Sequence, residues 1–593
     1  MNAHASFVTI LLAGVLLIGC AQQPTSPEGE AAPKVEQDQD TPAKANEPPV
    51  EPSASSDQPR SLPHTRSFTS DTLYALLAAE IAGSRQQFDI ALSNYLQQAY
   101  ETRDPQVAAR ATHIARFLSA ESAMLDASLI WVEVAPDDSE AQLNAALALL
   151  KGGRLQEAFE LSRKLQEKGE HTLFQNIAAS AAEATDTQRE QLLNGYLELL
   201  KTYPEHTELL VGTGLLLQQE EELEPALDYA NLALKSNPDN EAAHILKATL
   251  LSQMDRGGDA LRLLMEALED DPQSLRLRLQ YARLLTQHDI SLAQEQFEVL
   301  VQQEPTDPDL QLSLGIVALE NGDTDTAKES FETLLDVGEH TSPANFYLGQ
   351  IAEHEDRLEE ALLHYLQVEP GGDFLQATLN IQHILLENGE LEAANDHLNR
   401  LRNRFPDRAA DLYLLQARAL LQHGYTDYAE QVLDSALEQH PTHSDLLYSR
   451  AMLYARQGDP EATERDLREL LKYDPQNATA LNALGYTLAD NTDRYEEARD
   501  LIERALTLQP HEPAILDSMG WVLYKLGQPE EALPYLQEAA EAYPDQEIVA
   551  HLGEVLWQLG RREEARQVWQ QGLEVDPDSE LIPATMRRLQ VTP

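Results

Sequence analysis

Apolar residues recur along most of the chain at helical spacing, and short polar or proline-containing breaks separate the stretches. The segment from His511 to Pro544 shows this pattern twice, with Gly527 between the two apolar stretches. A spacing of three or four residues places side chains on one face of an α-helix. The segment therefore predicts two amphipathic helices joined by a turn. Their apolar faces contain Leu516, Met519 and Leu523 in the first helix, and Ala532, Leu536 and Ala539 in the second.

This pair of helices repeats with a period of about 34 residues. Prolines mark one phase of the repeat and alanines mark another, and the two series agree. A proline cannot continue a helix, so each of these prolines ends a pair. Because amphipathic helices of this kind bury their apolar faces only against neighbouring pairs, the pattern predicts a stacked array. The prolines are Pro136, Pro204, Pro238, Pro272, Pro305, Pro370, Pro406, Pro441, Pro475, Pro510, Pro544 and Pro577.

The small residues within each period resemble those of the tetratricopeptide repeat (TPR). In one unit, Leu484-Gly485 is followed by Ala498, Ala505 and Pro510, which matches the TPR pattern with one inserted residue. The resemblance implies an all-α fold, a right-handed TPR α-solenoid of about 15 helix pairs.

The N-terminal segment has a different character. Residues 7–19 are an unbroken apolar or small run, too short to span a bilayer but suited to a secretory signal peptide. The run ends in the sequence LIGC, whose last residue, Cys20, is the chain's only cysteine. These residues resemble the lipobox of bacterial lipoproteins, which implies cleavage before Cys20 and acylation of that residue. Ala21 follows in place of the aspartate that retains such proteins in the inner membrane, so the resemblance implies the periplasmic face of the outer membrane in a Gram-negative bacterium.

The residues after Cys20 are rich in proline, glutamate, glutamine and serine and contain almost no large apolar side chains. Such a composition cannot bury enough surface to offset the entropy of ordering, so it predicts a disordered tether. The expected organisation is a signal peptide over residues 1–19, the acylated cysteine and linker over 20–66, degenerate helical repeats over 67–136, the TPR solenoid over 137–577 and a capping segment over 578–593.

The chain is strongly acidic, with 100 aspartates and glutamates against 43 lysines and arginines and a net charge of −57. No basic stripe interrupts the acidic sequence. Such a charge repels nucleic-acid phosphates and anionic lipid surfaces, so nucleic acid is not an expected partner. The charge favours cationic partners, although it is equally consistent with a role in solubility alone.

The sequence contains none of the common catalytic signatures: no GxSxG elbow, no HExxH helix and no GxxxxGK phosphate loop. His440 and His443 form an H-x-x-H pattern, but acidic or sulfur ligands are missing at suitable spacing. We therefore expect a protein that is not an enzyme, with no catalytic residues, no metal site and no cofactor apart from the covalent lipid on Cys20.

The expected function is binding, along the concave face that the first helices of TPR pairs form. The TPR positions that line this face, carried onto the last three units, place Trp521 and Trp557 there beside carboxylates and an asparagine. Aromatic and polar side chains in such a line suit an extended or helical peptide. The alternative is that these tryptophans only stack between repeats, as Trp569 is expected to do at a core position. The candidate groove residues are Asn482, Tyr486, Asp490, Asp517, Trp521, Tyr524, Glu554 and Trp557.

Three stretches resemble a family of long proteobacterial TPR lipoproteins: Asp71–Ala99, Ala127–Gln142 and Leu481–Trp569. The best-understood relative in that family is the outer-membrane lipoprotein partner of a periplasmic carboxyl-terminal processing protease. The resemblance implies an adaptor that binds and activates the protease and presents peptidoglycan hydrolases for degradation. The alternative is a TPR lipoprotein that scaffolds an envelope secretion apparatus, for polysaccharide export or pilus assembly.

Overall fold

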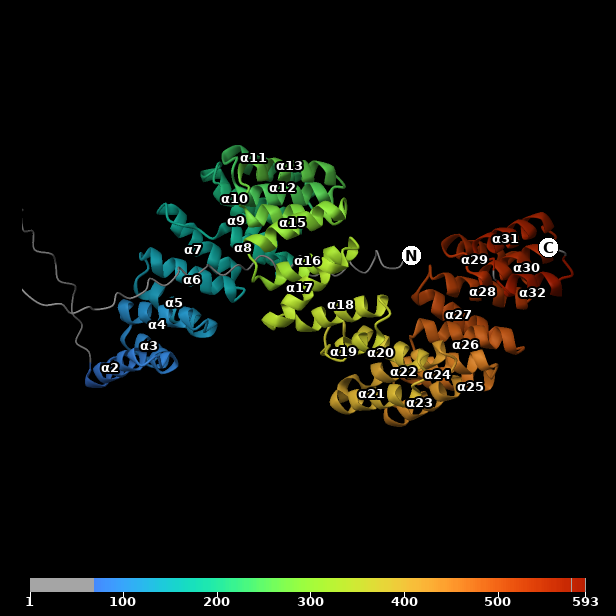
Figure 1. Ribbon diagram of the computed structural model, residues 1–593. Helices are drawn as coiled ribbons and strands as arrows, with labels where there is room; N and C mark the ends of the chain where they lie inside the picture. Colours follow the sequence, from blue (N-terminus) through green and yellow to red (C-terminus); the bar gives the residue numbers. More distant parts are fainter. Residues whose placement is uncertain (1–68, 578, 592–593) are drawn as a thin grey trace, which may run out of the picture. The chain divides into compact units, whose positions relative to one another are not determined.

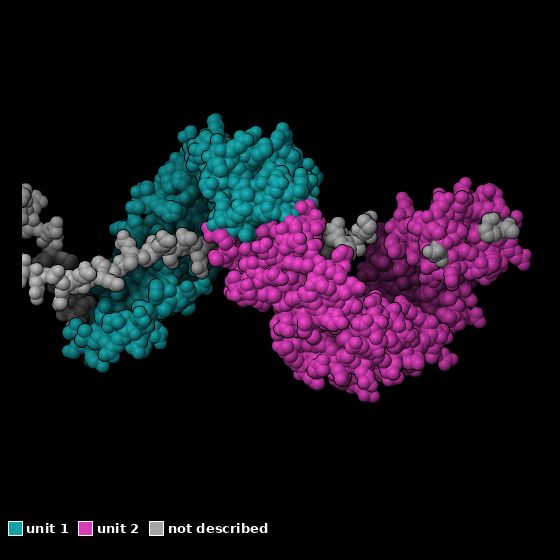
Figure 2. Space-filling view, in the orientation of Figure 1, with its two compact units in different colours: residues 1–303 teal, residues 304–593 magenta. Residues whose placement is uncertain are grey.

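The structure is a computed structural model that describes residues 69–577 and 579–591 (Figure 1). Within these residues it contains 31 α-helices and two short 3₁₀ helices, and no strand. The predicted all-α TPR solenoid architecture is therefore confirmed. The chain divides into two compact units, residues 1–303 and 304–593, which Figure 2 shows in different colours.

Unit 1 contains the first fourteen of these α-helices, from α2 to α15. Its helices are α2 (Ser70–Ser84), α3 (Phe88–Thr102), α4 (Pro105–Phe117), α5 (Glu121–Val134), α6 (Ser139–Lys151), α7 (Leu155–Glu167), α8 (Phe174–Ser180), η1 (Ala181–Glu183), α9 (Asp186–Thr202), α10 (Thr207–Gln219), α11 (Leu223–Ser236), α12 (Glu241–Gln253), α13 (Gly257–Asp270), α14 (Leu275–Leu285) and α15 (Ile290–Gln303).

Unit 2 contains the remaining helices, from α16 to α32. They are α16 (Pro308–Glu320), α17 (Thr324–Val337), α18 (Thr341–His354), α19 (Leu358–Tyr365), α20 (Phe374–Glu387), α21 (Leu391–Arg404), η2 (Pro406–Arg408), α22 (Ala409–Gln422), α23 (Thr426–Gln439), α24 (Ser444–Gln457), α25 (Pro460–Tyr473), α26 (Ala478–Asn491), α27 (Tyr495–Leu508), α28 (Pro513–Lys525), α29 (Pro529–Ala542), α30 (Gln546–Gln558), α31 (Arg562–Val575) and α32 (Leu581–Arg588).

Within each unit, consecutive helices pack as pairs, and each pair packs on the next. In unit 2, α26 packs on α27, α28 on α29 and α30 on α31, while α28 also contacts α26 and α30. The first helices of successive pairs therefore lie next to one another, and side chains one repeat apart can meet across them. The last short helix, α32, packs mainly on α30.

Close approach between helices explains the large–small pattern of the sequence. A Cβ added at Gly553 of α30 would lie 2.1 Å from Trp569 Nε1 of α31, and one added at Gly349 would lie 2.6 Å from the Tyr365 ring. The glycine in the first helix thus makes room for the aromatic ring of the second. Trp569 is fully buried, which confirms the prediction that it occupies a core position.

Many acidic and amide side chains act as helix caps, so part of the acidic composition is structural. The side chains of Asp138, Asn240, Asp307, Asn477 and Asp545 accept hydrogen bonds from backbone N–H groups in the first turns of their helices. These caps satisfy backbone donors that have no partner inside the helix. Repeat boundaries are therefore encoded locally in the sequence.

The predictions made for Cys20, the signal peptide and the linker concern residues outside the described part of the chain. Among the helices that the structure describes, none combines the length and the apolar character needed to cross a bilayer.

Candidate functional site

The predicted groove residues lie on α26, α28 and α30, the first helices of three successive pairs in unit 2. Because α28 contacts both α26 and α30, the structure brings their side chains together in one continuous line. The side chains of the line are less exposed than the prediction required, because residues one repeat further along the chain cover several of them.

Trp521 is the most deeply placed aromatic side chain of the line. It is 5% exposed, and its ring stacks on His551 with the ring centroids 3.9 Å apart and the planes 17° from parallel. Its Nε1–H donates a hydrogen bond to Asp490 Oδ1 at 3.3 Å, and Lys525 Nζ lies 4.9 Å from the ring centroid. Trp521 therefore stacks between repeats, as the alternative interpretation of the sequence held, and offers little surface to a partner.

Asp517 and His551 form a buried ion pair. His551 Nδ1 lies 3.0 Å from each carboxylate oxygen of Asp517, and both side chains are buried. Burial alone would lower the pKa of His551, but the carboxylates of Asp517, Glu547 and Glu554 outweigh it and raise the pKa above 6.5. The positive imidazole compensates the buried aspartate, so this pair holds α28 against α30.

Glu554 is the second buried carboxylate, with 2% exposure. Arg588 of α32 donates to it through both terminal nitrogens, with Nη1 at 2.7 Å from Oε1, and the Tyr524 hydroxyl donates at 3.2 Å. Burial and the nearby Glu554 carboxylate raise the pKa of Tyr524 to about 12. The bidentate contact with Arg588 attaches the last helix to the array.

The α26 end of the line is more accessible. Asp490 is exposed, and Tyr486 is half-buried with its hydroxyl donating to Glu547, two repeats along the chain. Burial and the carboxylate of Glu547 raise the pKa of Tyr486. Asn482 Nδ2 donates to the carbonyl of Ala514 at 3.4 Å, while Asn482 Oδ1 is buried and has no partner in the described part of the chain. An acceptor without a donor can take a hydrogen bond from a ligand.

Trp557 is half-buried at the other end of the line. Its ring lies 6.1 Å from that of Trp569, and the guanidinium carbons of Arg562 and Arg566 lie 5.2 Å and 5.6 Å from its centroid. The ring is therefore supported from the adjacent second helix, and part of it stays open to solvent.

Two functional residues were missed by the sequence reasoning, His551 and Arg588. Both lie 34 residues from the carboxylate they contact, Asp517 and Glu554 respectively. This separation equals one repeat, so a search for opposite charges one period apart could have found both. Other contacts along this line join residues 30 to 34 positions apart, among them Trp521 with Asp490 and Tyr524 with Glu554.

The accessible part of the line consists of hydrogen-bonding and aromatic groups: Asp490, Tyr486, Tyr524, Lys525 and Trp557. Such groups suit recognition of a protein segment. Among the described residues, no group of three or more histidine, cysteine, aspartate and glutamate side chains is placed to hold a metal ion.

Comparisons with known proteins agree with this architecture. Two tetratricopeptide repeat families match residues 409–576 and 312–373. The TPR repeat-containing protein PA4667 of Pseudomonas aeruginosa is 43% identical over 488 residues, which cover 82% of each chain. The type IV pilus assembly protein PilF of the same bacterium is 30% identical over 146 residues, 24% of this chain and 58% of PilF.

Among solved structures, the crystal structure of the APC/C hetero-tetramer Cut9-Hcn1 is similar over 82% of this chain and 97% of that chain, at 16% identity and a TM-score of 0.27. Tetratricopeptide repeats form scaffolds for protein–protein interaction and are generally not catalytic. Because its repeats match the family and it is 43% identical to PA4667 over 82% of each chain, this chain belongs to the tetratricopeptide-repeat protein family.

Proposed function

We propose that this chain is a lipid-anchored adaptor on the periplasmic face of the outer membrane. It binds and activates a carboxyl-terminal processing protease and presents peptidoglycan hydrolases to it. Acyl chains on Cys20 provide the anchor, since each buried CH₂ contributes about 0.8 kcal/mol and two or more chains hold a protein stably on a membrane.

The observation that carries the proposal is the line of side chains across α26, α28 and α30. Its buried members are fixed by ion pairs and stacking, so its accessible members are held in place before a partner arrives. A partner that binds pre-ordered side chains loses less conformational entropy than one that must order them. This preorganisation supports protein recognition as the role of the line.

A second candidate is a scaffold of an envelope secretion or pilus apparatus. The similarity to PilF favours it, since PilF is a type IV pilus assembly protein. That similarity covers a quarter of this chain, whereas the similarity to PA4667 covers four fifths.

Affinity purification of the tagged full chain from detergent-solubilised envelopes of its own bacterium distinguishes the two. We expect a carboxyl-terminal processing protease and peptidoglycan hydrolases among the captured proteins. The groove variant Asn482→Ala/Asp490→Ala should recover at least one of them about tenfold less, a loss of about 1.4 kcal/mol in binding. The matched control is Asp500→Ala/Gln509→Ala, which removes an exposed carboxylate from α27 and an exposed amide from the residue that follows this helix.

Recovery of pilus or secretion components without any protease would replace the adaptor proposal with the second candidate. Equal losses in the groove variant and the control variant would show that the α26–α30 line is not the binding surface. The anchor is tested in the same preparation, because Cys20→Ser should move the protein from the membrane fraction to the soluble fraction.

A further inference from the structure

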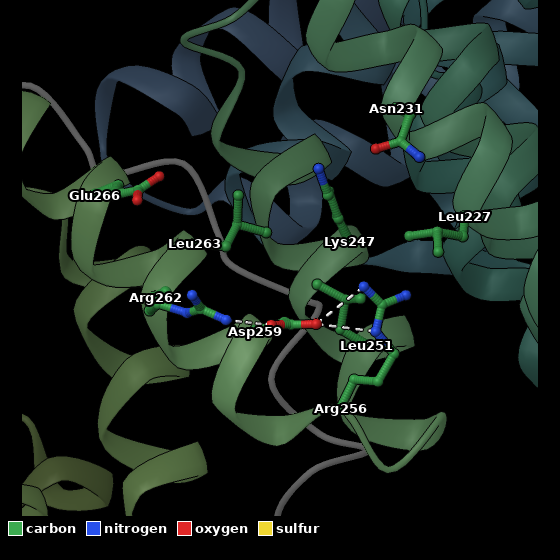
Figure 3. Close-up of a pocket in the computed structure, with 9 residues that line it drawn as sticks. All are labelled: Leu227, Asn231, Lys247, Leu251, Arg256, Asp259, Arg262, Leu263 and Glu266. Atoms are coloured by element: carbon green, nitrogen blue, oxygen red, sulfur yellow. Dashed lines mark hydrogen bonds and ion pairs between the residues drawn. The ribbon is translucent and has the colours of Figure 1, made fainter.

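A groove in unit 1 lies between α11 and α13, above α12 (Figure 3). It has a volume of about 370 Å³, within the range of roughly 300–1,000 Å³ that is usual for ligand pockets. Leu227, Leu251 and Leu263 provide its apolar lining. It belongs to a different unit from the α26–α30 line, so the inference below goes beyond the proposed function.

Two of the three cations in the groove are held by a shared carboxylate. Arg256 contacts Asp259 Oδ2 through Nε at 3.0 Å and Nη2 at 2.9 Å, and Arg262 donates to Oδ1 of the same residue. These hydrogen bonds keep the pKa of Asp259 below its usual range. A guanidinium has five N–H donors, so both arginines keep donors for a ligand while Asp259 fixes their position.

The third cation, Lys247, has no internal partner. Its side chain is half-buried, and it makes no hydrogen bond or ion pair with any residue in 69–577 or 579–591. Lys247 directly precedes the small residue Ala248 of the first helix of its pair. The same position is apolar in five other repeats, as Leu314, Leu348, Leu484, Met519 and Leu552, and polar in others, as Thr213, Gln416 and Arg450. Arg450, the cation among these, is paired with Asp466, unlike Lys247. The charge of Lys247 is therefore available to a ligand in the groove.

A groove at the equivalent place in unit 2 has a different balance of charge, with one cation, Arg499, against two carboxylates, Glu503 and Glu531. That groove lies between α27 and α29 above α28, and most of its lining residues occupy the same repeat positions. Met519 stands there in the place of Lys247, and Gln528 in the place of Arg256. The repeat therefore provides the shape of the groove, while the side chains of α12 and α13 provide its charge.

The charge of the groove opposes that of the whole protein. Its lining contains three cations against two carboxylates, Asp259 and Glu266, whereas the chain as a whole carries −57. A carboxylate about 4 Å from a lysine near a protein surface gains about 4 kcal/mol of Coulomb energy before desolvation is counted. An acidic segment is repelled by most of this protein but attracted here.

We infer that the α11–α13 groove binds an acidic segment of a partner protein, in which aspartate or glutamate residues alternate with large apolar residues. The carboxylates pair with Lys247 and Arg262, and the apolar side chains cover Leu227 and Leu263. Since the cations come from α12 and α13 while part of the apolar lining comes from α11, the segment crosses the boundary between two repeats.

Fluorescence anisotropy with the purified full chain tests this inference. The probe is a short fluorescein-labelled peptide in which glutamate alternates with leucine, and the matched peptide has glutamine at every glutamate. The variant Lys247→Gln/Arg262→Gln should weaken binding of the acidic probe about tenfold, while the control Lys235→Gln, which removes an exposed cation from α11 outside the groove, leaves it unchanged. Salt should weaken binding, because the Debye length falls from about 10 Å at 0.1 M to about 3 Å at 1 M.

Three results would each overturn the inference: no binding of the acidic probe to the wild-type protein, equal binding of the glutamine peptide, or equal effects of the groove and control variants. The single variant Arg262→Gln changes an exposed residue and keeps the test valid if the double variant unfolds. Failure here leaves the proposed adaptor function untouched, because that function is tested on residues of unit 2.

Discussion

The α11–α13 groove of unit 1 and the α27–α29 groove of unit 2 have the same repeat geometry, and their charges differ. Lys247 in the first corresponds to Met519 in the second, where the side chain is almost fully buried. The apolar residue contributes to the core, as Leu does at this position in other repeats. The lysine gives up that contribution, and unlike Arg450 at the same position of another repeat it has no carboxylate partner among the described residues.

The first helices of unit 2 show how this fold treats charges that serve packing. Asp517 is paired with His551, and Glu554 with Arg588. Both carboxylates are buried, and both partners come from the next first helix or from the terminal helix. The contrast with Lys247 suggests a simple distinction. Charged side chains that pair with each other hold neighbouring repeats together, whereas a charged side chain without an internal partner can pair with a ligand.

The largest expected effect comes from breaking a partnered charge. Arg588→Met leaves Glu554 buried without its cation. Loss of one partner of a buried pair costs about 3–5 kcal/mol, but the Arg588 side chain is 57% exposed, so we expect about 2 kcal/mol less stability in unit 2. Urea unfolding followed by tryptophan fluorescence measures this loss, because Trp521, Trp557 and Trp569 all lie in that unit.

The neighbouring exposed residue supplies the control for this experiment. Arg587→Met removes the same charge from the same helix without a buried partner, so its effect should stay within about 0.5 kcal/mol. Equal destabilisation by the two variants would mean that Glu554 does not depend on Arg588, and that the contrast between the two units is wrong.

The second effect is smaller and opposite in sign. Lys247→Met places in unit 1 the residue that unit 2 has at this position, so it should raise stability by about 0.5–1 kcal/mol. The same variant should bind the acidic probe more weakly than the wild type does. Thermal unfolding together with the anisotropy assay measures both quantities, and Lys235→Met serves as the control for the removal of one positive charge. A loss of stability in Lys247→Met would show that the lysine contributes to packing.

The sequence predicted the architecture well because each repeat carries its own boundary signals. Helix ends follow from prolines, glycines and capping side chains close in sequence, and the core position of Trp569 follows from the spacing of the pattern. The division at residues 303 and 304 was not predicted, because it depends on contacts between helices and not on any local signal.

The sequence predicted which helices carry the candidate site residues, but not how deeply these residues are buried. Helical spacing identifies the face that a residue occupies, and it placed Asp517, Trp521 and Glu554 on the line of first helices. It does not show which residue of the next repeat covers that face. His551 covers Trp521, and Arg588 covers Glu554, so these predicted contact residues are buried.

The cationic groove was missed for a related reason. Its three cations lie at residues 247, 256 and 262, on α12, in the turn that follows it and on α13, and acidic residues separate them in the sequence. Read along the chain, they form no basic stripe. The fold brings them together because α13 packs on α12 after the turn that contains Arg256.

The smallest expected effect is a pH dependence confined to unit 2. His551 faces the carboxylates of Asp517, Glu547 and Glu554, and its pKa lies above the unfolded value of 6.5. A raised pKa in the folded state means that the stabilisation is fully present below pH 6.5 and is lost as the pH rises through the folded value. The stability difference between wild type and His551→Gln should therefore shrink as the pH rises above 6.5.

Urea unfolding of both proteins across this pH range measures the difference, and taking it between two proteins cancels the contributions of other histidines. No histidine lines the α11–α13 groove, so binding of the acidic probe should stay constant over the same range. A stability difference that does not change with pH would mean that Asp517 and His551 are held together without the imidazolium charge. The pair would then resemble an ordinary neutral hydrogen bond, and the buried ion pairs of the α26–α30 line would be reduced to Glu554 and Arg588.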